Sequence, residues 1–157
     1  MIKKTEQVVQ EKWVPSFQFE EHHDRPFTAL KKPVSESKGV LISTGGFYPR
    51  GAAPFQDNYG LGDPSYREIA IQEDPHDLSI SHQHYDHTNA KADPNVGFPI
   101  ERLQEMTANK EIGVLAAFHY SFMGYVPIAH TLKTMVLPGL IRRLKQEEVD
   151  FAVLSPS

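Results

Sequence analysis

The 157-residue chain has 39% hydrophobic and 23% charged residues, a composition typical of one globular domain. Its net charge of −4 excludes a strongly basic surface for nucleic acid, and no apolar run approaches the roughly 20 residues that span a bilayer. Because the chain has no cysteine, it cannot form disulfides or thiolate metal sites of its own.

Residues 1–37 are polar and interrupted by prolines, which predicts an irregular arm around one short helix at residues 4–12. This segment lacks the apolar core of a signal peptide, so we expect a cytoplasmic protein. Four aromatic side chains are expected to anchor the arm to the rest of the molecule: Trp13, Phe17, Phe19 and Phe27. We therefore divide the chain into an arm at 1–37 and an α/β domain at 38–157.

From Gly39 onward, short apolar runs alternate with amphipathic stretches. The apolar runs predict strands at 39–43, 67–71, 77–81, 112–118 and from 150 onward. Residues 47–66, rich in glycine and proline, predict an ordered loop. Helices are predicted from Pro99 and over 128–148, with a fresh start at Pro138. The core-facing side chains of that second helix are predicted to be Leu140, Ile141 and Leu144.

Alternating strands and helices predict an α/β fold with a parallel, flavodoxin- or Rossmann-like sheet, crossover helices and an incomplete carboxyl-terminal end. Ligands bind such sheets at the carboxyl ends of the strands. Four polar clusters follow predicted strands and are expected to share this edge: residues 43–46, 81–82, 119–121 and 155–157. The alternative is that these residues are polar only because the strands leave the core there.

The second cluster contains the pattern His82-x-His84-x-Asp86-His87, which also occurs in two-zinc hydrolases of the metallo-β-lactamase type. Imidazoles and carboxylates are good zinc ligands, and zinc would activate a bound water. The later histidines, His119 and His130, do not stand where that family places its further ligands. A zinc-dependent hydrolase with ligands His82, His84, Asp86 and His87 therefore remains one alternative. Hydrogen bonding of these histidines within a tight loop is another.

Four segments resemble, in order, the B-component family of glycine, sarcosine, betaine and D-proline reductases: "LISTGGFYPRGAAPF", "GDPSYREIA", "SHQHYDHTNAKADPNVGFPIERLQEM" and "EIGVLAAFHYSFMGY". The resemblance runs from about Phe27 to Pro156. Its most specific block is an Asp-x-Asn-x-x-Phe-Pro-x-x-Arg-Leu pattern at residues 93–103. The histidine-rich segment then resembles the family's Ser-His-x-x-Tyr-Asp motif, with His84 and His87 making it imitate a zinc signature.

The resemblance implies a selenium-dependent reductase that cleaves a C–N bond of a glycine, sarcosine, betaine or D-proline type substrate. It implies a selenocysteine or cysteine nucleophile just after Ser157, which these 157 residues lack. We therefore expect a UGA codon read as a stop, and a fragment that is inactive alone. A short, non-catalytic assembly subunit is the alternative. The implied partners are a pyruvoyl-bearing subunit, a selenoprotein A-like component, thiol electron donors and a small amino-acid substrate.

The candidate site residues come from the strand ends and from the resemblance. Three are predicted to be catalytic: His82, Asp86 and His119, with His119 as a proton donor. Six are predicted to bind substrate: Thr44, Gly45, Gly46, Arg67, Tyr85 and Ser121. Gly45 and Gly46 would offer backbone N–H groups to a carboxylate, and Arg67 would bind a carboxylate bidentately. No metal and no cofactor is assigned to this chain itself.

Overall fold

A computed structural model describes residues 2–12, 15–19, 23, 28–56, 60–82, 85–127 and 129–156. Its helices in chain order are α1 (Ile2–Lys12), η1 (Val34–Glu36), η2 (Pro75–Asp77), α2 (Thr88–Ala92), η3 (Pro94–Val96), α3 (Ile100–Ala108), α4 (Ala129–Thr131), η4 (Leu132–Val136) and α5 (Leu137–Gln146). Its strands are β1 (Lys38–Ser43), β2 (Phe47–Pro49), β3 (Tyr66–Ala70), β4 (Leu78–Ile80), β5 (Val114–Leu115), β6 (Phe118–Phe122) and β7 (Phe151–Ser155).

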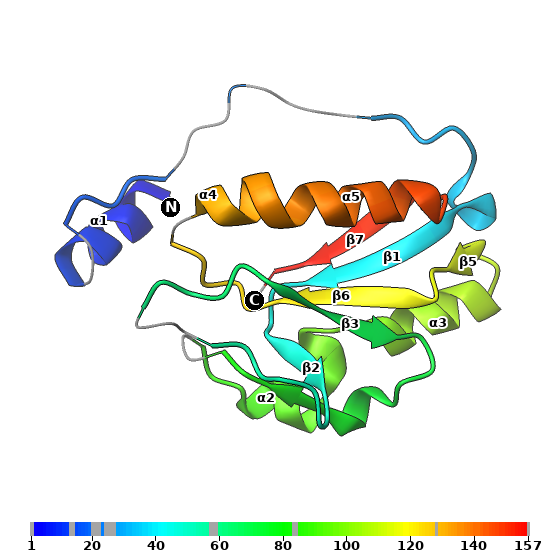
Figure 1. Cartoon of the computed structure of the whole chain (residues 1–157), viewed down its shortest axis with the longest axis horizontal. Coiled ribbons are helices and arrows are strands. Elements are labelled where there is room, and N and C mark those ends of the chain that lie inside the picture. The colour runs from blue at the N-terminus through cyan, green and yellow to red at the C-terminus, as the bar shows by residue number, and fades with distance from the viewer. Residues whose placement is uncertain are drawn as a thin grey trace.

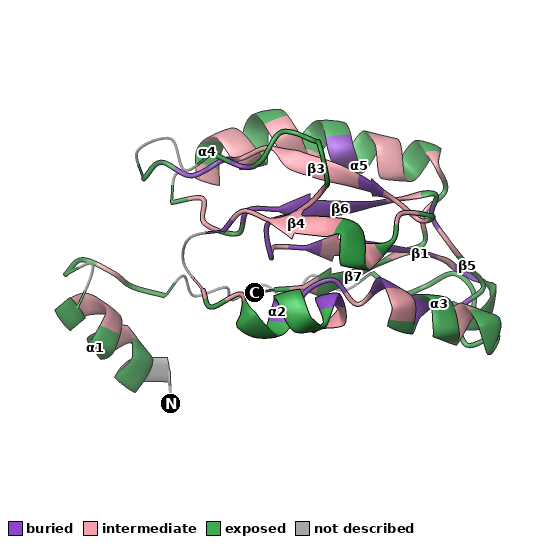
Figure 2. Ribbon diagram, turned by 90° about the horizontal axis from the view of Figure 1, so that it is seen from below, coloured by how far each residue is buried: buried purple, intermediate pink, exposed green. Residues whose placement is uncertain are grey.

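A central sheet lies between two helical layers (Figures 1 and 2). Strand β1 is hydrogen-bonded in parallel to β7 on one side and to β5 and β6 on the other. Val40 and Leu41 of β1 are fully buried, because helices cover both faces of the sheet. The predicted α/β fold with a largely parallel sheet is confirmed. Strand β3 differs, since it pairs antiparallel with β6, and a pattern of apolar residues does not encode strand direction.

The predicted strand at 112–118 was placed wrongly. The structure has a short strand, β5, then a break at Ala116 and Ala117, and then the longer strand β6. Ala116 N–H still donates to Gly39 O at 2.9 Å, so the chain stays beside β1 through the break. The polar residues His119 and Ser121 made the start of β6 resemble a strand end, but they alternate with Phe118, Tyr120 and Phe122 as a strand requires.

One face of the sheet is covered by the helical segment of α4, η4 and α5 (Figure 1). Pro138 has no N–H to donate to the carbonyl of Thr134, and the wider π-helical turn η4 directly precedes it. Leu140 is buried and belongs to a cluster with Val40, as predicted. Ile141 was predicted to face the core, but its side chain is 48% exposed. No described helix is long and apolar enough to cross a membrane.

The opposite face is covered by α2, η3 and α3, and Leu103 of α3 packs in a cluster with Leu41 of β1. Helix α3 follows Pro99, as predicted. Strands β2 and β4 form a separate antiparallel pair, so part of the predicted loop at 47–66 is a strand with a buried Phe47. Strand β4 agrees with the predicted strand at 77–81, whereas α2 was not predicted.

The amino-terminal helix α1 lies apart from the two layers in both views (Figures 1 and 2). It contacts the segment that follows it, because Gln10 Nε2 donates to Phe17 O at 2.6 Å. Phe17 and Phe19 pack edge to face at 4.9 Å, and Phe19 is 43% exposed, so their predicted anchoring to the domain is not supported. Trp13 and Phe27 lie outside the described residues. The domain boundary at residue 37 stays a prediction.

Candidate functional site

Three serines lie side by side at the carboxyl ends of neighbouring parallel strands. Ser43 of β1 is in register with Ser121 of β6 and with Ser155 of β7. The hydroxyls of Ser43 and Ser155 both donate to Gly97 O, at 2.7 and 3.0 Å. The buried Ser121 Oγ has no hydrogen-bond partner among the described residues. Gly97 belongs to the most family-specific block of the sequence, which is therefore tied to the carboxyl edge of the sheet.

Replacing Ser43 with alanine is expected to lower the free energy of unfolding by about 2 kcal/mol, because two buried groups lose a partner. Gly97 O loses one donor, and Gly45 N–H loses its acceptor, Ser43 Oγ, at 2.9 Å. Urea denaturation measures this change. Ser155→Ala is the matched control, since it removes one bond to the same carbonyl and is expected to cost about 1 kcal/mol. Equal losses in the two variants would contradict this account.

The turn after β1, Thr44–Gly46, connects three strands through its backbone. Thr44 N–H donates to Ser155 O, Gly45 N–H to Ser43 Oγ and Gly46 N–H to Phe122 O, all at 2.9–3.0 Å. These N–H groups are thus used within the fold, and the geometry does not support the predicted anion nest at Gly45 and Gly46. Gly46 has a φ of +70°, and a Cβ there would lie 2.7 Å from Ser81 O, so a larger residue is excluded.

The histidine-rich loop that follows β4 lies against this turn. Ser81 N–H donates to Gly46 O at 2.9 Å, and His82 is 6% exposed. The rings of His82 and Tyr85 pack edge to face at 4.8 Å, and those of Tyr85 and His87 at 4.5 Å. Tyr85 Oη donates to Gly45 O at 2.9 Å, and burial raises the pKa of the Tyr85 phenol. The predicted meeting of this loop with the 43–46 cluster therefore occurs.

The zinc alternative is not supported. Asp86 Oδ1 accepts the Thr88 N–H and hydroxyl, so its carboxylate forms a local turn at the start of α2. The same Thr88 hydroxyl, followed by the Thr88 N–H, lowers the pKa of this exposed carboxyl group, which disfavours a role as an acid. No group of three potential ligands occurs in the described part of the chain. His84 lies outside the described residues. The sequence Asp-x-Thr was the local signal for this turn.

His119 lies inside β6 and not at its end, so its predicted position was wrong. The ring is fully buried, and its Nδ1 accepts the Leu41 N–H at 2.9 Å. The imidazole thereby takes the place of a backbone carbonyl as the hydrogen-bond acceptor for β1, at the break between β5 and β6. Burial lowers the pKa of His119 to about 4, which keeps the ring neutral. Its Nε2 has no partner among the described residues. This environment favours a structural role over proton donation to a substrate.

The stability of the protein is expected to fall as the pH is lowered from 6.5 to 4. In this range the unfolded chain binds a proton at His119, whose ordinary pKa is 6.5, whereas the folded chain does not. The expected loss is about 3 kcal/mol at pH 4. His119→Asn keeps an acceptor for Leu41 and should remove this part of the pH dependence in urea denaturation. An unchanged slope in that variant would show that His119 does not cause it.

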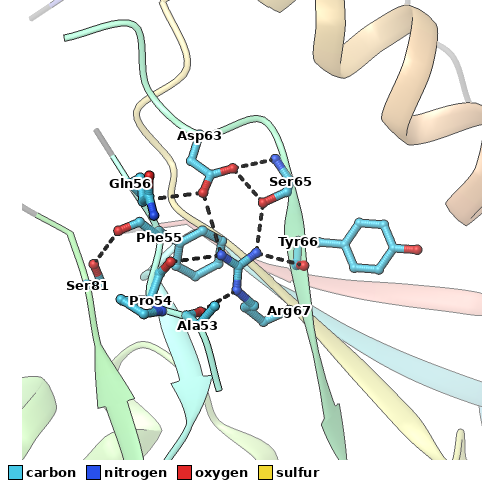
Figure 3. Close-up of polar contacts among 9 residues, drawn as sticks. All are labelled: Ala53, Pro54, Phe55, Gln56, Asp63, Ser65, Tyr66, Arg67 and Ser81. Carbon is cyan, nitrogen blue, oxygen red and sulfur yellow. Dashed lines mark hydrogen bonds and ion pairs between the residues drawn. The ribbon is translucent and has the colours of Figure 1, made fainter. Parts of the chain in front are cut away.

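Arg67 of β3 is the cross-strand partner of Ser121 in β6, and its guanidinium holds the loop before β3 (Figure 3). Its guanidinium lies 4.2 Å from the Phe55 ring centroid and pairs with Asp63 at 3.6 Å. It also donates to four other oxygens: Ala53 O, Pro54 O, Tyr66 O and Ser65 Oγ. Burial opposes ionisation of Asp63, but hydrogen bonds from Ser65 and Gln56 and the Arg67 charge lower its pKa overall. Four of the five guanidinium N–H groups are therefore used within the fold, so the geometry does not support the predicted bidentate binding of a substrate carboxylate.

The carboxyl edge thus gathers six of the predicted residues: Thr44, Gly45, Gly46, His82, Tyr85 and Ser121. Of the other three, Arg67 lies across the strands from Ser121 but is engaged by loop carbonyls, Asp86 accepts from Thr88, and His119 lies inside β6. On the α5 side of this edge, a pocket of about 310 Å³ is lined by Thr44, Phe122, Gly124, Val126, Leu132 and Leu137. Sequence reasoning assigned no site role to Gly97 or Gly124, and it named His87 only as a ligand of the alternative zinc site. The buried Nε2 of His87 lacks a partner among the described residues. A functional role for any of these residues stays a prediction.

Comparison with known proteins agrees with the resemblance seen in the sequence. The family model for glycine/sarcosine/betaine reductase selenoprotein B matches residues 7–157. The D-proline reductase subunit gamma of Acetoanaerobium sticklandii is 26% identical over 129 residues, which are 82% of this chain and 52% of that subunit. The chain therefore spans about half the length of this curated relative. No solved structure matches.

Proposed function

Because the chain belongs to the glycine/sarcosine/betaine reductase selenoprotein B family, we propose that it forms the substrate side of a reductase that cleaves a C–N bond. The substrate class is a small amino acid or amine of the glycine, sarcosine, betaine or D-proline type. One observation carries the proposal: the carboxyl ends of β1, β6 and β7 meet the histidine-rich loop at one edge. Substrates of wound α/β folds bind at such an edge.

Three side chains of this edge have proposed roles. The Ser121 hydroxyl donates to a substrate carboxylate, and its support is that this buried group has no partner among the described residues. His82 exchanges a proton with the substrate amine, since its imidazole lies between the turns at Gly46 and Gly124. Tyr85 orients His82 through their ring contact and through its own hydrogen bond to Gly45 O.

The nucleophile is proposed to come from outside these 157 residues, which contain no cysteine. In this family's chemistry a selenol or thiol would attack the carbon next to nitrogen, so that the C–N bond breaks and the amine leaves. A pyruvoyl group on a partner subunit would hold the amine, and a dithiol would supply the two electrons. The edge fits an anionic nucleophile, because the Ser121 hydroxyl there has no partner among the described residues, while the Asp86 carboxylate accepts from Thr88 at the start of α2. We propose a cytoplasmic complex with a selenoprotein A-like component and thiol donors.

The test is a reconstitution of the complete reductase with its partner subunits and a dithiol, supplied in turn with glycine, sarcosine, betaine and D-proline. Release of the reduced amine or amino-acid product is measured. Ser121→Ala is expected to raise KM about 10-fold, as the loss of a charge-assisted hydrogen bond would. Ser79→Ala is the control, because Ser79 lies in β4, opposite Tyr48 of β2 and outside the main sheet. Normal kinetics in both Ser121→Ala and His82→Gln would reject the proposed site.

A further inference from the structure

The two edges of the sheet are built differently. At one edge, β3 carries Arg67 and Glu68, and Glu68 forms an ion pair with Arg143 of α5. Arg67 also holds the loop at Ala53 and Pro54 beside this strand. Charged side chains and a covering loop are common devices that prevent an edge strand from pairing with another chain. The β3 edge is therefore a protected end of the sheet.

The described residues show neither device along β7, and the nearest ion pair, between Lys32 and Asp150, lies just before the strand. Its sequence, Phe-Ala-Val-Leu-Ser, contains no charge and no proline. All five residues are in register with β1 on one side, and no strand pairs with the other side in the described part of the chain. Leu154 is 70% exposed. An apolar, unpaired and uncharged strand is the kind of edge that takes up a further strand.

The helix above this edge extends the apolar surface. Ile141 of α5, which the sequence pattern assigned to the core, is 48% exposed. A hollow of about 210 Å³ lies between α5 and β7, and its lining includes Ile141, Leu144, Phe151 and Ala152. Parallel strands are normally covered on both faces, so a helix residue patterned for the core indicates that a strand belongs beneath it. Leu154 and Ile141 together mark the place of that strand.

We infer that β7 is an interior strand of a larger sheet, whose next strand comes from the half of the reductase component that these 157 residues do not contain. The occupant follows from the comparison, because the chain covers 52% of the D-proline reductase subunit gamma that it matches. The added strand pairs with the outer side of β7 and places an apolar side chain against Leu154 and Ile141. This inference rests on family membership and not on the proposed catalytic roles.

The test compares two forms of the protein. One is the 157-residue chain, and the other is the product of the reading frame that follows codon 157, with any UGA decoded as cysteine. Leu154→Lys is expected to lower the Tm of the longer form by about 5 °C or more, because it buries a charge, and to change that of the shorter form by less than about 2 °C. Leu61→Lys, at a leucine that is 55% exposed in a loop far along the chain from β7, is expected to affect neither form.

Amide hydrogen exchange gives the second readout. The β7 amides that exchange freely in the shorter form are expected to be protected at least about 100-fold in the longer form. The inference is wrong if no reading frame continues, if Leu154→Lys affects both forms equally, or if β7 exchange is unchanged. Sedimentation of the shorter form as a dimer that Leu154→Lys dissociates would assign the edge to a second copy and also overturn it. Protection of β7 in a longer form that reduces no substrate even when reconstituted with its partner subunits and a dithiol would reject the proposed function alone.

Discussion

Replacing Gly124 with alanine is expected to lower the free energy of unfolding by about 3 kcal/mol or more. Gly124 follows β6 with a φ of +83°, where side chains are strained. A Cβ at this position would lie 2.5 Å from Thr44 O and 3.0 Å from His82 Nε2. The methyl group must therefore displace the turn after β1, the His82 ring, or both.

Urea denaturation measures the loss of stability, and the NMR signals of the His82 ring report its displacement. Gly51→Ala is the matched control, since Gly51 has a φ of +89° but a Cβ there would meet no atom within 4 Å. That variant carries the backbone strain without the collision and is expected to cost about 1 kcal/mol. If the two variants lose the same stability, the close approach of Gly124 to Thr44 and His82 does not matter.

Replacing Arg67 with alanine is expected to cost about 3 kcal/mol, because a largely buried ion pair loses one partner and several loop carbonyls lose their donors. The side chains of Arg67 and Asp63 are 17% and 12% exposed. The loop at residues 53–56 should then detach from β3, which limited proteolysis within that loop can detect. Arg67→Lys keeps the charge but not the planar set of donors, so it should recover only part of the loss.

Arg50→Ala is the control for this prediction, since Arg50 also pairs with an aspartate, Asp77, at 3.3 Å. That pair is exposed, with side chains that are 74% and 57% accessible, and its loss is expected to cost less than about 0.5 kcal/mol. Similar losses for Arg50 and Arg67 would mean that the network in Figure 3 does not hold the loop.

The sequence predicted the features that depend on local patterns. The apolar runs identified β1 and β7, Pro99 marked the start of α3, and the motifs from Phe27 to Pro156 pointed to the family that the comparison supports. The errors involve contacts between distant segments. His119 was wrongly assigned to a strand end. Its role inside β6 is to accept the N–H of Leu41, which is 78 residues away, and the local sequence does not show this contact. Nothing in the local sequence shows that the Arg67 guanidinium is occupied by loop carbonyls.

In the candidate site, too, local patterns were predicted correctly and contacts between distant residues were not. The clusters at 43–46 and 81–82 were expected to meet, and they do, because both follow strands that end near the same edge. The bonds from Ser43 and Ser155 to Gly97 O join residues 54 and 58 positions apart, and no periodicity encodes them. Asp86 was the avoidable error, because an aspartate two residues before a helical threonine is a local turn pattern.

The shared carbonyl of Gly97 also limits how the carboxyl edge can open. The hydroxyls of Ser43 in β1 and Ser155 in β7 both donate to this oxygen. The segment between α2 and α3 therefore cannot move outward unless both hydrogen bonds break. We therefore expect breathing motions that admit a small molecule to occur on the opposite flank, where the pocket beside Leu132 and Leu137 meets the π-helical turn. A small molecule would then enter and leave the carboxyl edge only from the α5 side of the sheet.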